Sequence, residues 1–242
     1  MRRLLSFVLY ITIALQIVNA QESSNGIIKF MNIPVDGSEE IMKQQLEEKS
    51  FKYNMFEGCY QGKFNGKNVS VLISTNHNNV DRICVVYPEM SEISIKSEYN
   101  RLLEQFQKNN KYLSLPVNKV IPEEENIKYE ISLRNKTYSC SFLYISPDIY
   151  SEDERVCIKS NIERMMGKSD PFLEEISTEM TESLISCFSQ RENDILPVDK
   201  VSNLFAHIRD GIVSFVLNEN NGIYRIVIYY DNMVNRPHGE DL

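Results

Sequence analysis

The stretch Glu57–Pro88, EGCYQGKFNGKNVSVLISTNHNNVDRICVVYP, decides the fold. It holds three runs rich in β-branched and aromatic residues, separated by two turn signals. Asn65-Gly66 is typical of a two-residue type I′ turn, which needs a positive φ at both positions. The second turn, Asn76–Asn79, consists of residues that tolerate left-handed backbone. The stretch therefore predicts a three-stranded antiparallel meander.

The two turns also predict which side chains share a face. If Phe64 pairs with Lys67, then Tyr60 faces Val71, and a second loop of about five residues places Val71 opposite Val85. One face is then strongly apolar and needs a partner layer: Tyr60, Val69, Val71, Ile73, Ile83, Val85 and Tyr87. The other face mixes polar and apolar residues: Gln61, Lys63, Ser70, Ser74 and Arg82 with Cys59, Leu72, Cys84 and Val86.

Residues 1–20 have the pattern of a secretory signal peptide. Arg2-Arg3 precede an apolar run, and Val18-Asn19-Ala20 has the small residues that precede a cleavage site. The apolar run is too short for a comfortable membrane span, although an uncleaved anchor is the alternative. Gln21 stands where a lipid-anchored bacterial protein would have Cys. We therefore expect an exported protein, periplasmic or extracellular, without a lipid anchor and without a transmembrane segment after cleavage.

The charge of the chain limits its classes of partner, and its length limits the number of domains. The formal net charge is −8, and it becomes more negative when Arg2 and Arg3 are removed with the signal. Since no basic stripe is present, nucleic acid and anionic membrane surfaces are poor candidate partners. Residues 21–242 are long enough to bury a sizeable core, and no low-complexity linker divides them. We expect one domain, and the sequence shows no convincing full-length repeat.

The five cysteines do not form a recognisable framework. Their odd number argues against paired disulfides, and a CxxC motif or a Cys/His zinc spacing is missing from the sequence. Cys59 and Cys84 share a face but are separated by the middle strand, about 9.6 Å, which exceeds the reach of a disulfide. We expect mostly reduced, buried thiols and no cofactor.

The rest of the chain alternates helical and β patterns. We expect a helix from Asp36, whose capping box includes Glu39, to about Lys49, and a second helix over about Glu92–Tyr112. Further hairpins are expected over Ile127–Arg134 with Thr137–Ile145, and over Ile212–Leu217 with Ile223–Tyr230. Between them, a helical block at about 147–209 begins with a capping box at Ser151 and Glu154. Together these elements predict an α+β fold with an antiparallel sheet of about seven strands and helices mainly on one face.

Three groups of residues carry a resemblance to known proteins. They are Phe30–Gly37 (FMNIPVDG), Gly62–Gly66 (GKFNG), and Tyr229–Asn232 (YYDN) followed by Asn235 and the GEDL ending at 239–242. Together they resemble a group of small exported proteins of gut bacteria of the Bacteroides type, for which no activity is known. The resemblance covers about 29–145 and 211–242, whereas the block at 147–209 looks longer than in that group. It implies export and an α+β fold. In outline, the helix-plus-meander arrangement also resembles small bacterial inhibitor and outer-membrane assembly proteins, an analogy that does not carry function.

Catalytic chemistry has little support in the sequence. The three histidines, His77, His207 and His238, lie far apart and have no acidic or nucleophilic partner at a diagnostic spacing. No GxSxG, HExxH, P-loop or GxGxxG motif is present. Asp231, Glu240 and Asp241 are a weak candidate set for a hard cation, because they lack the spacing of a known loop. We therefore expect no metal and no catalytic residues.

The remaining signal is a set of strand tyrosines. Most are expected in the core, but a row of them on an open face would bind a partner; the candidate surface is Tyr138, Tyr144, Tyr224, Tyr229 and Tyr230. The sequence thus favours a non-enzymatic interaction module that binds an unknown protein or envelope component. The alternatives are an envelope hydrolase with an unrecognised site and an inhibitor of a secreted enzyme. A cleft with perturbed carboxylates would favour the hydrolase, and a broad aromatic surface would favour the binder.

Overall fold

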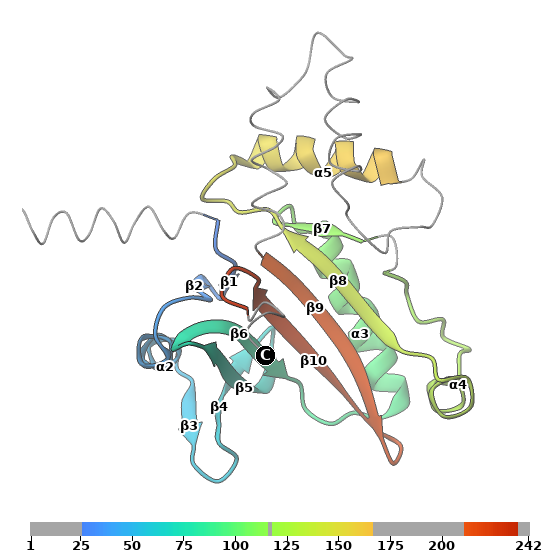
Figure 1. Ribbon diagram of the computed structural model, residues 1–242. Helices are drawn as coiled ribbons and strands as arrows, with labels where there is room; N and C mark the ends of the chain where they lie inside the picture. The colour runs from blue at the N-terminus through green and yellow to red at the C-terminus, as the bar shows by residue number, and fades with distance from the viewer. Residues whose placement is uncertain (1–25, 116–117, 167–210, 237–242) are drawn as a thin grey trace, which may run out of the picture.

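The computed structural model describes residues 26–115, 118–166 and 211–236 (Figure 1). Its helices are α2 (Glu39–Glu48), α3 (Glu92–Lys108), α4 (Ile127–Arg134) and α5 (Glu152–Met166). Its first strands are β1 (Lys29–Phe30), β2 (Ile33–Pro34), β3 (Lys52–Asn54), β4 (Cys59–Phe64), β5 (Lys67–Asn76) and β6 (Asn79–Val86). The later strands are β7 (Tyr112–Ser114), β8 (Tyr138–Tyr144), β9 (Gly211–Asn220) and β10 (Ile223–Asn232). Within this part of the chain, no helix is long and apolar enough to cross a membrane.

Eight strands form one antiparallel sheet in the order β3-β4-β5-β6-β10-β9-β8-β7, and β1 pairs with β2 in a separate hairpin. This confirms the α+β class and the antiparallel sheet. The sequence patterns missed both edge strands, β3 and β7, which are only three residues long each. Strands this short have too few residues for alternation to show.

The order of elements repeats along the chain. Helix α2 precedes the four consecutive strands β3–β6, and helix α3 precedes the four strands β7–β10. The sheet order is therefore symmetrical about the central pair of β6 and β10. In the second half, α4 lies between β7 and β8, and α5 lies between β8 and β9. The repeat is one of topology and is not visible as a repeat in the sequence.

The meander has the predicted register. Tyr60 pairs with Val71, and Val71 pairs with Val85. The Asn65-Gly66 turn has the two positive φ angles expected of type I′, +50° and +78°. The second turn is tighter than expected, because Asn76 already pairs with Asn79, and an irregularity after Ser74 restores the predicted pairing further along.

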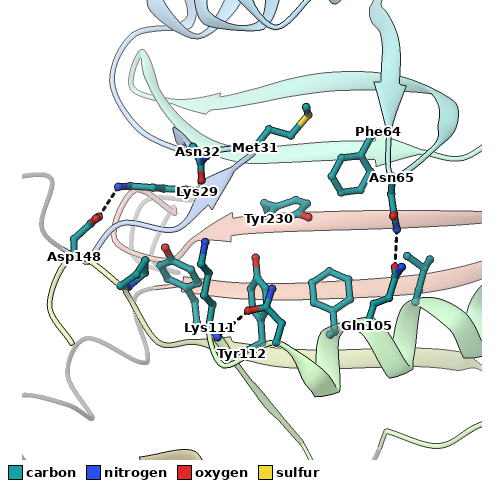
Figure 2. Close-up of a pocket in the computed structure, with 15 residues that line it drawn as sticks. Lys29, Met31, Asn32, Phe64, Asn65, Gln105, Lys111, Tyr112, Asp148 and Tyr230 are labelled. Atoms are coloured by element: carbon teal, nitrogen blue, oxygen red, sulfur yellow. Dashed lines mark hydrogen bonds and ion pairs between the residues drawn. The ribbon is translucent and has the colours of Figure 1, made fainter. Parts of the chain in front are cut away.

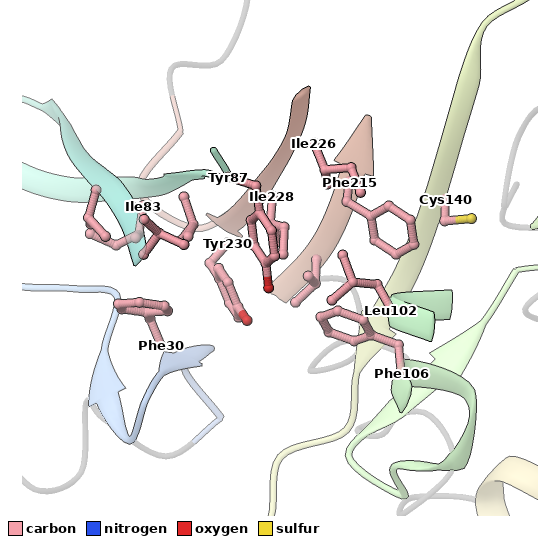
Figure 3. Close-up of a cluster of buried hydrophobic side chains, with 14 of the residues drawn as sticks. Phe30, Ile83, Tyr87, Leu102, Phe106, Cys140, Phe215, Ile226, Ile228 and Tyr230 are labelled. Carbon is pink, nitrogen blue, oxygen red and sulfur yellow. The ribbon is translucent and has the colours of Figure 1, made fainter. Parts of the chain in front are cut away.

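Helices α2 and α3 cover the same face of the sheet, called the inner face below, and the core lies between the helices and the sheet. Figure 3 shows part of this core, where Leu102 and Phe106 of α3 lie against Phe215 of the sheet. The row Val71, Val85, Ile228 and Phe215 runs across this face from β5 to β9. Tyr99 of α3 packs its ring against Phe215 at 5.0 Å. Strand β10 pairs with β6 on one side and β9 on the other, which confirms the prediction that this doubly apolar strand lies inside the sheet.

The hairpin expected over Ile127–Arg134 is wrong, because these residues form helix α4. Asn126 caps its start by accepting a hydrogen bond from the Tyr129 N–H at 2.8 Å, and Asn135 ends it with a φ of +52°. Ile127 and Ile131, which turn toward the core, are four residues apart. Side chains four residues apart lie on one face of either a strand or a helix. The pattern of apolar residues in so short a segment therefore could not distinguish the two structures. The partner expected for β8 in this segment is replaced by β7.

Two helix boundaries also differ from the predictions, and a third agrees with them. Helix α2 is capped by Ser38 rather than by Asp36, since the Ser38 side chain accepts from the Ile41 N–H. Helix α3 ends at Lys108, and the residues expected to complete it turn into β7. In the helical block, α5 begins at the predicted capping box, where the Ser151 N–H donates to the Glu154 carboxylate at 2.9 Å. The rest of the block lies outside the described residues.

The segments that carry the sequence resemblance meet in the fold. The Asn232 side chain donates to the Val35 carbonyl at 2.8 Å. The Asn235 side chain donates to the Asp36 carboxylate at 2.7 Å and to the Val80 carbonyl at 2.9 Å. These bonds fasten the chain after β10 to the turn before α2. Part of the first and third of these groups is therefore explained by structural contacts rather than by the chemistry of a site.

Candidate functional site

A cavity of about 590 Å³ opens on the inner side of the sheet, where the two halves of the fold meet. Its walls are the β1–β2 hairpin, the β4–β5 turn, the last turns of α3, strand β7 and the loop after β8, with β10 at its floor (Figure 2). Sites for small molecules usually span roughly 300–1,000 Å³. The lining residues are Lys29, Met31, Asn32, Phe64, Asn65, Leu102, Gln105, Phe106, Asn109, Lys111, Tyr112, Tyr144, Pro147, Asp148 and Tyr230.

Aromatic rings form much of the cavity wall. Tyr112 and Tyr144 are direct partners across β7 and β8, with their ring centres 5.8 Å apart. Phe106 of α3 packs edge-on against Tyr112 at 4.9 Å. Tyr230 belongs to the inner face of β10, and its ring lies in the middle of the site in Figure 2. The wall is therefore apolar along the rings and polar at their hydroxyl ends.

The tyrosine hydroxyls are the unusual feature of this site. Tyr112, Tyr144 and Tyr230 are each more than nine-tenths buried. Buried tyrosine hydroxyls normally have a hydrogen-bond partner. Yet the Tyr144 hydroxyl makes no hydrogen bond, and those of Tyr112 and Tyr230 make none to any residue that the structure describes. The cavity thus gathers three polar groups whose bonding capacity the protein itself leaves unused.

Burial keeps these hydroxyls protonated. It raises the pKa of Tyr144 to about 12, and the nearby Asp148 carboxylate adds to the rise, whereas the Ser146 side chain, which lies near but does not reach hydrogen-bonding geometry, moderates it. Burial raises the pKa of Tyr112 and Tyr230 as well, and the proximity of other tyrosine hydroxyls adds to the effect. Near neutral pH all three side chains are therefore neutral hydrogen-bond donors rather than phenolates.

Two polar contacts close opposite ends of the rim (Figure 2). At one end the Lys29 ammonium meets the Asp148 carboxylate at 2.5 Å. At the other end the Asn65 side chain donates to the Gln105 side chain at 2.7 Å. Lys111 adds a second ammonium to the lining. Asp148 is the one carboxylate among the described lining residues and already faces Lys29, so these residues carry a net charge of +1, and Lys111 also interacts with the Glu152 carboxylate outside the lining.

Tight turns place the rim residues. Met31 and Asn32 both have positive φ, +51° and +67°, so β1 reverses within two residues and presents Lys29 beside the loop after β8. The type I′ turn at Asn65 does the same on the other side, where it brings the amide against α3. Local sequence signals thus determine the two turns, but the cavity forms only because the fold brings these turns close to α3, β7 and β10.

The described lining residues supply hydrogen-bond donors and positive charge. They combine ammonium groups, amides and neutral tyrosine hydroxyls, and they include neither a histidine nor a thiol. General acid–base catalysis needs a group that changes protonation near the working pH. The tyrosines titrate far above that range, and the carboxylate of Asp148 is engaged by a lysine. The geometry accordingly suits a held ligand.

A second hollow lies on the outer face of the sheet, the face opposite α2 and α3. This outer groove has a volume of about 980 Å³, and its floor includes Ser70, Leu72 and Val86. A smaller hollow of about 200 Å³ continues from it along β10 and β9, and the two share Val86, Glu89 and Arg225. The ion pair of Arg225 with Glu89 spans the junction.

The five tyrosines proposed as a partner surface do not share one open face. Tyr138, Tyr144, Tyr224 and Tyr230 are buried, and the Tyr224 hydroxyl donates to Glu92 at 3.1 Å. Tyr229 lies on the outer face beneath the Arg82 guanidinium, 4.7 Å from the ring centre. The alternation of side chains along β10 separates Tyr229 from Tyr230. Only Tyr144 and Tyr230 come together, and they do so in the cavity rather than on a surface.

The other candidates from the sequence were three acidic residues and three histidines. Asp231 is buried between Arg82, at 2.5 Å, and Arg236, at 3.1 Å, so its carboxylate is already neutralised. Glu240 and Asp241 lie outside the described residues, as do His207 and His238. His77 occupies the β5–β6 turn with a φ of +48°. In the described ranges, no group of three or more His, Cys, Asp or Glu residues could hold a metal ion.

Most of the cavity residues gave no signal in the sequence. Lys29, Gln105, Lys111 and Tyr112 come from separate elements, and each has an ordinary local environment. Asn65 was identified, but only as a turn former. An excess of tyrosines in strands was the one usable hint, and it pointed to two of the right residues.

Comparison of the chain with protein-family models, with curated proteins and with solved structures finds no match. The cavity and the outer groove therefore have to be interpreted from their own geometry.

Proposed function

We propose that the mature protein is an exported, non-enzymatic binding module whose cavity holds a small organic anion with an aromatic body. The three tyrosine hydroxyls without protein partners carry this proposal. A ligand with hydrogen-bond acceptors would satisfy all three, and its rings would stack on Phe106, Tyr112 and Phe64. Export, without a lipid anchor, is supported by the residue pattern over 1–20.

The charge of the lining favours an anion over a sugar. Lys29 and Lys111 supply donors, whereas the described lining offers one carboxylate, which Lys29 already engages. A saccharide presents many hydroxyl donors, which need acceptors in the site. A carboxylate is acceptor-only and would bond to neutral tyrosine hydroxyls and ammonium groups alike. Aromatic carboxylates are thus the best match in both shape and charge.

The test compares aromatic carboxylates with neutral analogues. Titration calorimetry and thermal shifts with 4-hydroxybenzoate, cinnamate and indole-3-acetate should show binding, while the corresponding amides or alcohols should bind at least about tenfold more weakly. Equal responses to both series, or no binding of any carboxylate, would contradict the proposal.

Tyr144→Phe separates binding from stability. Removing a buried hydroxyl that has no partner should leave the free protein as stable as before or more stable by about 1 kcal/mol. The same change should weaken binding of the carboxylate about tenfold, because a hydrogen bond to a charged group is lost. Tyr99→Phe is the matched control, since that buried hydroxyl contacts the Cys140 thiol at 3.1 Å and lies outside the cavity. If both variants bind alike, the Tyr144 hydroxyl does not face the ligand.

A further inference from the structure

The cavity has two chemically different ends, which Figure 2 shows on opposite sides of the site. One end, called the basic end below, holds all the charged residues of the described lining: Lys29, Lys111 and Asp148. The other, called the amide end below, holds Asn65 and Gln105. A ligand that fills the cavity therefore meets charged groups at one end and neutral amides at the other.

The basic end suits the carboxylate of the ligand. An ammonium group has three N–H donors, so the ion pair of Lys29 with Asp148 leaves donors for a ligand, and Lys111 adds more. The unpartnered Tyr144 hydroxyl belongs to this end as well, because it lies close enough to Asp148 for that carboxylate to raise its pKa. A carboxylate is acceptor-only and matches a set of donors of this kind.

The amide end is fixed as a hydrogen-bond donor. A guanidinium has only donors, so Asn65 turns its side-chain oxygen toward Arg101, 3.5 Å from Nη1. Arg101 is itself held by the Glu98 carboxylate, 3.1 Å from Nε. With its oxygen directed in this way, Asn65 donates through its side-chain nitrogen to the Gln105 oxygen at 2.7 Å. What remains is the Gln105 Nε2 amide, whose N–H groups bond to no residue that the structure describes.

We propose that the cavity binds aromatic carboxylates in one orientation and selects those that carry a hydrogen-bond acceptor opposite the carboxylate, with Gln105 as the residue that determines this preference. The carboxylate lies at the basic end, and the ring of the ligand lies against the aromatic wall between the two ends. A carbonyl or ether oxygen at the amide end accepts from Gln105, whereas a donor group there would meet N–H groups. This inference rests on the proposed function and adds an orientation and a selectivity to it.

The experiment compares ligands that differ only in the acceptor. In 4-acetylbenzoate the carbonyl oxygen is the acceptor, and in 4-isopropenylbenzoate a CH₂ group of similar shape replaces it. The same pair is prepared as phenylacetates and as cinnamates, because the span between the two ends decides which length fits. In titration calorimetry with the mature protein, the acetyl ligand of the fitting length should bind about 3–10-fold more tightly than its isopropenyl partner.

Two substitutions by methionine separate the ends of the cavity. Gln105→Met keeps the length of the side chain but removes its donors, so the ratio of the two dissociation constants should fall to about one. Lys111→Met should weaken binding of both ligands about tenfold and leave their ratio as in the wild type. Since Gln105 is exposed, the urea midpoint of Gln105→Met should stay close to that of the wild type, which excludes a folding defect as the cause.

This inference and the proposed function fail in different ways. Equal binding of the acetyl and isopropenyl ligands at every length would overturn the inference and leave the proposed function standing. A preference that persists in Gln105→Met would overturn it too, because the acceptor would then lie elsewhere in the cavity. If no ligand of either series binds, the proposed function is refuted and the inference with it.

Discussion

Two neighbouring rows of side chains cross β5, β6 and β10, one residue apart, and point to opposite faces of the sheet. The inner row is Val71, Val85 and Ile228, and each of these is fully buried under the helices. The outer row is Leu72, Cys84 and Tyr229, and none of them is fully buried. Both rows have apolar members, so hydrophobicity by itself does not distinguish them. The difference is that packing fixes one row, while the other remains available for contact with another molecule.

The largest expected effect concerns the tyrosines of the inner face at high pH. Burial raises the pKa of Tyr87, Tyr144 and Tyr224 to about 12, above the value near 10 of an unfolded chain. The folded state therefore holds these protons more tightly, so its stability is complete below pH 10 and falls as the pH rises toward 12. Urea unfolding between pH 8 and 12 should show a loss of several kcal/mol. Ionisation of Tyr87, Tyr144 or Tyr224 near pH 10, followed for each ring by NMR while the fold is unchanged, would contradict this.

Ile228→Ala should come next, because it creates a cavity at the centre of the inner row. Ile228 is fully buried between β6 and β9. Such a truncation costs about 2–5 kcal/mol, measured as a lower urea midpoint at constant slope. Leu72→Ala on the outer face is the control and should cost less than about 1 kcal/mol. Equal losses at the two positions would mean that the faces do not differ in packing.

Gly62→Ala tests the inner face by overpacking. A Cβ atom at Gly62 would overlap the ring of Phe51, which has no room to move because it is buried. We expect a loss of about 1–3 kcal/mol of unfolding free energy in urea. Gln61→Ala, one residue away on the outer face, should change it by less than about 0.5 kcal/mol. A neutral Gly62→Ala would show that the Phe51 ring relaxes more readily than a packed core should.

The smallest effect is a difference in thiol chemistry between the faces. Cys140 belongs to the inner face and is 1% exposed, whereas Cys84 belongs to the outer face and is partly exposed. Burial raises the pKa of both thiols, that of Cys84 to about 11, so each should react slowly with iodoacetamide at pH 8. Timed alkylation with mass spectrometry should still modify Cys84 before Cys140. Modification of Cys140 before Cys84 would mean that the outer face around Cys84 is covered.

Local signals predicted a large part of this fold. Asn65-Gly66 determined the turn, and the turn then determined the pairing of Tyr60 with Val71, because strand alternation leaves no other register once a two-residue turn is set. The doubly apolar residues of β10 likewise placed that strand inside the sheet. The segment 127–134 failed because its two isoleucines, four residues apart, satisfy helix and strand equally well in so short a run.

The sequence by itself determined the α+β class, the turns and the face of each meander residue, since these depend on neighbours a few residues away. Tertiary structure alone decided the cavity and the exposure of Met55 and Phe56. Tyr112, Tyr144 and Tyr230 come from three strands, and only the sheet order brings their hydroxyls to one space without protein partners. Met55 and Phe56 would suit a core equally well in the sequence, and it is their position at the end of a hairpin held by Asn54 that leaves them in solvent. Apolar character is local, but burial depends on what the rest of the chain places above each side chain.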